Sequence, residues 1–368
     1  MELAQNRSTG FDYLRICLSL AVVFWHTVVV CYGLQVQEAV WAGPLHPFVA
    51  SILPMFFALS GFLVCGSLDR CRTLVSFLSL RALRIFPALI TEVILSALLL
   101  GPLLTTLPLA EYLSGPSLHI YFLNVLGVIH YYLPGLFEHN PLPGIVNNQL
   151  WTVPYELDCY ILLSVVVGAG IFRVKGWLSH AFIGLIVFMQ LMLVIQIFKN
   201  PQASELGFSG QNMVLCFLTG VALFKHRHKV LWHWSLALGA VLLSLVLLPL
   251  HGGGNLCALP ISYLTIYLGL MTPKVPAWLT SGDYSYGIYL YSFPIQQSVA
   301  LIPGTHVWYI NALISLPLTM LAALASWHLL EKHVMKHKKI VYRLEDWLLR
   351  LWSGYHSTKA ASQDIVGE

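Results

Sequence analysis

The chain has 368 residues, of which 57% are hydrophobic and 10% are charged. An ordinary soluble domain has roughly 25% charged residues, so this composition excludes a soluble globular protein and predicts an integral membrane protein. The net charge of +4 and the seven scattered cysteines do not indicate a nucleic-acid partner, a disulfide framework or a zinc site. We therefore expect no metal and no nucleic acid.

Apolar runs close to the length that crosses a bilayer, about 20 residues, recur along the whole chain between short polar breaks. They predict an all-α integral membrane protein with about ten transmembrane helices, in one polytopic domain that covers residues 1–333. The candidate spans are 12–33, 46–67, 85–107, 155–173, 180–198, 211–224, 231–250, 255–272, 284–303 and 308–330.

An eleventh apolar run, residues 118–137, contains Asn124, two histidines and several tyrosines. If it is a re-entrant or surface segment rather than a crossing, nearly all basic residues fall on one side of the membrane, as the positive-inside rule requires. We therefore expect both termini in the cytoplasm and residues 108–154 outside. The residues that then face the cytoplasm include Arg7, Arg70, Arg72, Arg81, Arg84, Arg173, Lys175, Lys225, Lys229 and Lys274.

The last part of the chain, residues 334–368, is expected to be a cytoplasmic tail. Residues 340–352 place apolar side chains at helical spacing beside basic ones, which predicts an amphipathic helix that lies on the membrane lipids. The final sixteen residues, 353–368, are polar, and we expect them to be disordered.

Two ionisable residues, Arg15 and His26, lie within the first predicted span. They are eleven residues apart, which is about 20° past three full helical turns, so they share one face and are separated by about 16 Å along the axis. One interpretation is a snorkelling arginine and a hydrogen-bonded histidine in a packed bundle. The other is chemical: a guanidinium binds phosphate near the cytoplasm, and an imidazole acts as a base nearer the outside.

Three other stretches contain residues suited to the same chemistry. Arg81 and Arg84, three residues apart on the cytoplasmic lip of the third predicted span, suit a phosphate or lipid headgroups. Ser285 and Tyr286 begin a later span, where their hydroxyls could line a donor pocket or cap the helix. On the outer side, Trp151 and Glu156 could bind a sugar by stacking and hydrogen bonding, although an acidic first turn is also ordinary capping.

Six motifs taken together resemble the acyltransferase-3 family of membrane proteins, which O-acylate bacterial cell-surface glycans. They are FDYLRICLSLAVVFWH, FFALSGFLV, RALRIFP, LWTVPYE, YSYGIYLY and SWHLLEKH, in the order and spacing of the family over residues 10–333. Two departures stand out. Ser292 occupies a position where members often carry histidine, and His333 follows Glu331 and Lys332 where proline is common.

The resemblance implies a ten-span enzyme of the bacterial inner membrane. It would transfer an acyl group, usually acetyl, from cytosolic acetyl-CoA or another acyl-CoA to a hydroxyl of a cell-surface or lipid-linked polysaccharide. His26 would be the catalytic base, and Arg15, Arg81 and Arg84 would bind coenzyme A. The chain carries no added extracellular domain, so a one-domain transferase is expected.

Two rival functions also fit a sparsely charged polytopic protein. One is a transporter or flippase for a lipid-linked sugar, although the chain lacks the paired, Gly/Pro-broken helices in matching halves that transporters tend to have. The other is a non-catalytic scaffold in polysaccharide assembly machinery, which would leave the alignment of Arg15 with His26 unexplained.

Overall fold

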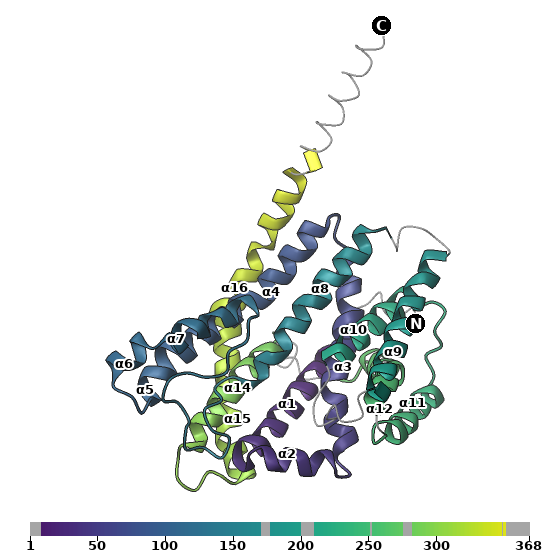
Figure 1. Cartoon of the computed structure of the whole chain (residues 1–368). Helices are drawn as coiled ribbons and strands as arrows, with labels where there is room; N and C mark the ends of the chain where they lie inside the picture. The colour runs from purple at the N-terminus through teal and green to yellow at the C-terminus, as the bar shows by residue number, and fades with distance from the viewer. Residues whose placement is uncertain are drawn as a thin grey trace.

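The computed structural model describes residues 9–170, 177–199, 210–250, 252–274, 282–347 and 349–350. These residues form a bundle of helices (Figure 1), and the described ranges contain no strand beyond one isolated bridge between Tyr132 and Ile145. The all-α prediction is therefore confirmed for the part of the chain that is described.

Every one of the ten predicted spans coincides with a helix. Five helical segments of the described chain are long and apolar enough to cross a membrane: 9–32, 46–68, 74–104, 148–168 and 308–347. The other helices are not among these five, so the total of ten crossings stays a prediction. The helices that match the predicted spans are α1 (Thr9–Tyr32), α3 (His46–Leu68), α4 (Leu74–Leu95), α8 (Val153–Gly168), α9 (Trp177–Lys199), α10 (Gly210–Lys225), α11 (Trp234–Leu247), α13 (Ala258–Gly269), α14 (Ser285–Ala300) and α15 (Trp308–Ala325).

Two groups of helices form the body of the bundle. In one, α14 packs against both α1 and α15, and in the other α3 packs against α10 and α13. Glycines allow the close approach of α3 to α10: a Cβ added to Gly61 would lie 2.0 Å from the carbonyl oxygen of Phe217, and one added to Gly220 would lie 2.1 Å from that of Ala58. Small residues at this contact let two membrane helices meet backbone to backbone.

Helix α4 begins earlier than the sequence suggested. The Thr73 side chain accepts a hydrogen bond from the Ser76 backbone N–H at 3.1 Å, which caps the helix at residue 74. The helix then continues through a π-helical stretch, η2 (Ser96–Leu100), into α5 (Gly101–Leu104). Arg81 and Arg84 consequently lie inside the helix, about two turns after its start, and not on a lip that precedes it.

The segment 118–137 does not form a spanning helix. It contains part of α7 (Pro116–Tyr121), the short 3-10 helix η3 (Phe122–Leu126) and irregular backbone. The Asn124 side chain stabilises this backbone, since it donates to the His130 carbonyl at 2.9 Å and accepts from the His130 N–H at 2.8 Å.

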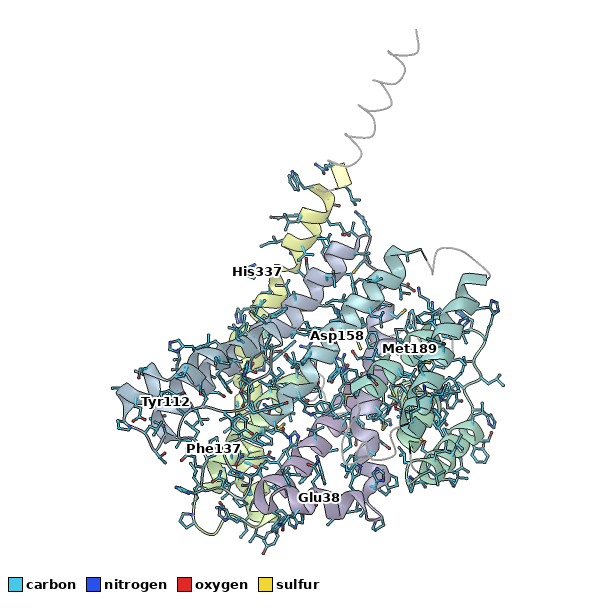
Figure 2. The ribbon with its side chains drawn as sticks, in the orientation of Figure 1. Glu38, Tyr112, Phe137, Asp158, Met189 and His337 are labelled. Carbon is cyan, nitrogen blue, oxygen red and sulfur yellow. The ribbon has the colours of Figure 1, made fainter. Side chains whose placement is uncertain are left out.

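The preceding short helix, α6 (Leu109–Ser114), is anchored by a buried tyrosine. Figure 2 labels Tyr112, whose hydroxyl donates to the Ala97 carbonyl at 2.6 Å, and Phe137, which is buried at the other end of this part of the chain. The segment is thus packed against the bundle, and its position relative to the membrane stays a prediction.

The end of α15 continues into a long projecting helix (Figure 1) through η5 (Ser326–Glu331), α16 (Lys332–Val334) and η6 (Met335–His337). Residues 338–347 are helical, and Glu345 accepts a hydrogen bond from Thr73 at 3.0 Å. The predicted amphipathic helix 340–352 is therefore continuous with α15 as far as residue 347. Residue 348, the predicted disordered end, Arg7, Arg173 and Lys175 lie outside the described residues.

Candidate active site: two adjoining cavities

Arg15 and His26 of α1 line two different cavities inside the bundle. Arg15 lines an inner cavity of about 130 Å³, here called the arginine cavity. His26 lines a second one of about 280 Å³, here called the histidine cavity. Leu53 of α3 and Tyr289 of α14 line both, so the two cavities adjoin at these side chains.

The arginine cavity brings together the side chains that the sequence suggested for a donor pocket. It is lined by residues from α1, α4 and α14, together with apolar side chains of α3 and hydroxyl groups of α8 and η4 (Asn148–Thr152). The predicted donor residues among its lining are Arg15, Arg81, Arg84, Ser285 and Tyr286. Their shared location is consistent with that prediction, although their roles stay predictions.

The cavity also depends on an acidic residue that the sequence reasoning missed, Asp283. Its Oδ2 lies 3.0 Å from Arg15 Nη1 and 2.5 Å from Arg84 Nη2, and its Oδ1 accepts a hydrogen bond from Ser285 Oγ at 2.8 Å. Burial alone would raise the pKa of Asp283, but the two guanidinium groups, with the Ser285 hydrogen bond, lower it well below its usual range. Asp283 is thus a fixed anion that joins α1 to α4.

Glu331 is a second acidic partner of Arg84. Its Oε2 lies 3.4 Å from Arg84 Nη1, while its Oε1 accepts a hydrogen bond from Ser326 Oγ at 2.9 Å. Ser326 in turn accepts from the Tyr291 hydroxyl at 3.1 Å. The stretch from Ser326 to Glu331 is π-helical, and such bulges frequently occur at functional sites.

Arg81 is held differently from the other two arginines. Its Nη2 donates to Ser67 Oγ at 3.1 Å, and its buried Nε has no hydrogen-bond partner. Arg81 forms no ion pair with any described residue, in contrast to Arg15 and Arg84. Of the three guanidinium groups, Arg81 is the one with a buried N–H that lacks a partner among the described residues.

Glu156 and Trp151, which the sequence suggested for sugar binding, line different cavities. Glu156, in the first turn of α8, lines the arginine cavity and accepts a hydrogen bond from the Tyr160 hydroxyl. Trp151 lines the histidine cavity. Their separation of five residues exceeds one helical turn and crosses the junction of η4 with α8, so the two side chains enter different spaces.

The histidine cavity is uncharged along its lining. Trp25 and His26 of α1, Gln37 of α2 (Leu34–Trp41), and Asn148 and Trp151 of η4 line it together with aliphatic side chains. His26 is 7% exposed, and the ring of Phe293 packs edge-on against its imidazole with 5.1 Å between centroids. The buried Nδ1 of His26 has no hydrogen-bond partner.

Hydrogen bonds hold the wall between the cavities in place. The Tyr289 hydroxyl donates to the Gln149 carbonyl at 2.7 Å and lies 2.6 Å from Thr152 Oγ1. Pro294 lacks an N–H, which leaves the Leu290 carbonyl without its helical donor. The Gln149 side chain supplies the missing donor at 2.6 Å, so η4 is fastened to α14 at this level.

Two further residues bear on the expected chemistry. Ser292, where related sequences were expected to carry histidine, is fully buried and donates to the Tyr289 carbonyl at 3.3 Å. Among the described residues there is no group of three His, Cys, Asp or Glu side chains placed to hold a metal ion.

Comparison with known proteins identifies relatives along nearly the full chain. A family model described as an acyltransferase domain matches residues 8–332. An O-acetyl transferase of Shigella phage Sf6 is 28% identical over 345 residues, which is 90% of this chain and 97% of that protein. Nodulation protein 10 of Rhizobium leguminosarum bv. viciae is 26% identical over 362 residues, 91% of this chain and 95% of that protein. No solved structure matches the chain.

Proposed function

Because this chain belongs to the acyltransferase-3 family, we propose that it is a transmembrane O-acetyltransferase. It takes the acetyl group from acetyl-CoA on the cytoplasmic side and delivers it to a hydroxyl of a cell-surface or lipid-linked polysaccharide outside. The observation that carries this proposal is the pair of adjoining cavities, one basic and one containing a buried histidine, which meet at Leu53 and Tyr289.

The arginine cavity is the proposed donor site. Guanidinium groups bind phosphate oxygens through charge-assisted, often bidentate hydrogen bonds, and coenzyme A carries several phosphate oxygens. Arg81, which has no ion-pair partner among the described residues, can bind a phosphate oxygen directly. Arg15 and Arg84 are held in a fixed orientation by Asp283. Ser285 and Tyr286 add hydroxyl groups at the same cavity, and its apolar lining suits the acyl-bearing arm of the donor.

The histidine cavity is the proposed acceptor site. A sugar presents an apolar ring face, which stacks on an aromatic side chain, and hydroxyl groups, which need hydrogen-bonding partners. Trp151 supplies the aromatic face, and Asn148 and Gln37 supply amides. Glu156 lines the other cavity, so we assign the sugar contact to Trp151 and not to Glu156.

His26 is the proposed general base. Its neutral imidazole removes the proton of the acceptor hydroxyl as the oxygen attacks the thioester carbonyl carbon, a step that typically contributes about 10² to 10⁴-fold. The carbon–sulfur bond then breaks, and the thiolate of coenzyme A takes the proton from the imidazolium. One proton and one acetyl group have exchanged places, so no further reactant is needed.

The membrane arrangement follows the same proposal. We infer ten crossings by the helices that match the predicted spans, both termini in the cytoplasm, and a bacterial inner membrane. Residues 1–333 form the catalytic membrane domain, and 334–368 form the tail. Under this arrangement the arginine cavity belongs to the cytoplasmic half, and the histidine cavity with residues 108–154 belongs to the outer half.

Transfer of labelled acetate tests the proposal directly. Membranes from cells with and without the gene are incubated with acetyl-CoA that carries a radioactive acetyl group. Alkali-labile label in the carbohydrate fraction, present with the gene alone, is the expected result. A transporter or flippase would change the amount of exported glycan without adding label, and that outcome would refute the acyltransferase assignment for this chain.

A further inference from the structure

Three buried polar atoms around the turn of α1 that carries His26 have no hydrogen-bond partner among the described residues. They are His26 Nδ1, the Gln296 side-chain oxygen Oε1 and the Asn311 side-chain oxygen Oδ1. Gln296 and Asn311 are fully buried. Leaving a buried polar group unsatisfied costs about 1–3 kcal/mol, so three such atoms on neighbouring helices require an explanation.

Hydrogen bonds and a ring contact place Gln296 beside the turn of α1 that carries His26. The Gln296 amide nitrogen donates to the Val23 carbonyl at 2.8 Å and to Thr27 Oγ1 at 2.6 Å. Val23 and Thr27 flank His26 on α1. One turn before Gln296 on α14, Phe293 packs against the imidazole ring. Helix α14 is therefore seated directly on the turn that carries the proposed base.

Asn311 joins from the third helix, α15. Its Nδ2 donates to the Gln296 backbone carbonyl at 3.1 Å. In both amides the NH₂ group faces a carbonyl oxygen, so exchanging nitrogen and oxygen would set two acceptors against each other. The orientation of both side chains is thus fixed, and each leaves its oxygen as an unused acceptor.

Counting donors and acceptors selects one arrangement. If His26 Nε2 is the basic atom, the ring carries its proton on Nδ1, which then needs an acceptor. One water molecule would satisfy every group if it accepted that Nδ1–H and donated its two protons to Gln296 Oε1 and Asn311 Oδ1. With the proton on Nε2, the same site would hold three acceptors against two water protons.

We propose that Gln296 and Asn311 are positioning residues that hold the Nδ1–H of His26 through one shared water molecule. They thereby fix Nε2 as the atom that takes the proton. In many enzymes a carboxylate accepts the Nδ1–H of the catalytic histidine and so fixes its tautomer. Here two uncharged amides would take that role. The inference rests on the proposed function for its catalytic meaning, while the tautomer itself can be measured without any turnover.

The surroundings of His26 contain little else that titrates. In the lining of the histidine cavity, α2 presents Gln37, α3 presents Ile52 and Leu53, and η4 presents Asn148 and Trp151. Tyr289 of α14 is the one other titratable side chain in that lining, and it ionises well above neutral pH. A change in the pH profile after substitution at Gln296 would therefore report on His26.

Gln297 provides a matched control on the same helix. It is also fully buried, but its amide nitrogen donates to the carbonyls of Leu142 and Ile145, and its Oε1 accepts from Asn140 at 2.7 Å. All its hydrogen bonds are made, and they fasten the outer loop to α14. Gln297→Met should lower the melting temperature and leave kcat per folded molecule unchanged.

The experiment measures acetyl transfer from labelled acetyl-CoA to the carbohydrate fraction of the source cells. Gln296→Met is expected to lower kcat roughly 10- to 100-fold, as is typical when a residue that orients a histidine is lost, with KM for acetyl-CoA unchanged. Asn311→Leu should behave alike, and the double variant should lose little more than either one because both act through one water.

Nitrogen NMR of protein labelled in its histidine rings gives the second readout, with the His26 signal assigned by comparison with His26→Ala. The expected result is a neutral ring protonated on Nδ1, shifted toward a tautomer mixture in Gln296→Met. A ring protonated on Nε2, or additive losses in the double variant, would overturn the inference. If wild-type protein transfers no acetyl group but shows the Nδ1 tautomer, the proposed function fails and this inference stands.

Discussion

The arginine cavity contains charged side chains, whereas the histidine cavity has an uncharged lining. The arginine cavity is ionic: Asp283 and Glu331 compensate Arg15 and Arg84, and each charge has a partner on another segment. The histidine cavity is lined by aromatic rings, amides and aliphatic groups, and its buried imidazole has no charged neighbour in that lining. Under the proposed function, this difference separates the binding of the anionic donor, which needs a charged environment, from proton transfer, which needs an uncharged one.

Substitution of His26, the proposed base, should reduce the rate of acetyl transfer more than any other change considered below. His26→Ala is expected to lower acetyl transfer by at least about 10²-fold, because a general base typically contributes that much or more. Binding of acetyl-CoA, measured as the shift in melting temperature that it causes, should persist. The control is His119→Ala on exposed α7, which should leave the rate unchanged, and an active His26→Ala enzyme would refute the base assignment.

Removal of the Asp283 carboxylate, which pairs with both Arg15 and Arg84, should lower the free energy of unfolding. Asp283→Asn removes the carboxylate that pairs with Arg15 and one of the two that pair with Arg84, and breaking a buried ion pair typically costs about 3–5 kcal/mol. The free energy of unfolding can be followed by thermal melting in detergent. Asp69→Asn is the matched control, since its partner Lys225 lies at a more exposed pair, where the cost should stay below about 1 kcal/mol. Equal losses in the two variants would contradict this account.

Arg81→Ala should weaken binding of the acyl donor without lowering the stability of the protein. Because Arg81 has a spare donor and its hydrogen bond in the protein goes to Ser67, we expect KM for acetyl-CoA to rise about tenfold, the equivalent of one charge-assisted hydrogen bond. The melting temperature should change little. Arg72→Ala, at an exposed pair with Asp346, should change neither quantity, and an unaltered KM in Arg81→Ala would exclude Arg81 from donor binding.

The last prediction concerns how the stability contributed by Asp283 depends on pH. The pKa of Asp283 in the folded protein is lowered from its ordinary value of 3.8, despite burial, by Arg84 and Arg15. A carboxylate with a lowered pKa contributes stability that is fully present above the unfolded pKa and is lost as pH falls through the folded one. The stability difference between wild type and Asp283→Asn should therefore be constant from about pH 5 to 8 and shrink below about pH 4. A difference that varies between pH 6 and 8 would point to another group.

The sequence predicted the helices well because apolar length is a local property. All ten predicted spans coincide with helices, and the period of 3.6 residues placed Arg15 and His26 on one side of α1. The start of α4 was missed because the Thr73 cap lies before the apolar run. Capping by a threonine is a local signal, so this error could have been avoided.

The partners within the site were harder to predict. Asp283 contacts Arg15 across 268 positions of the chain, and nothing local in the sequence indicates such a pair. Glu156 was grouped with Trp151 because the two are close in sequence, but the junction of η4 and α8 sends them into different cavities. Gln296 and Gln297 gave an unused signal, since consecutive amides in an apolar span require specific hydrogen-bond partners.

The side chains of Leu53 and Tyr289, common to both cavities, have a consequence for the cell. Under the proposed function, the reactants come from two aqueous compartments. A continuous water path between these compartments would dissipate the electrochemical gradient across the membrane. The phenol ring of Tyr289, hydrogen-bonded to Gln149 and Thr152, lies with Leu53 where the two cavities meet. Under the proposed function, we expect this pair to let an acetyl group pass and to exclude ions.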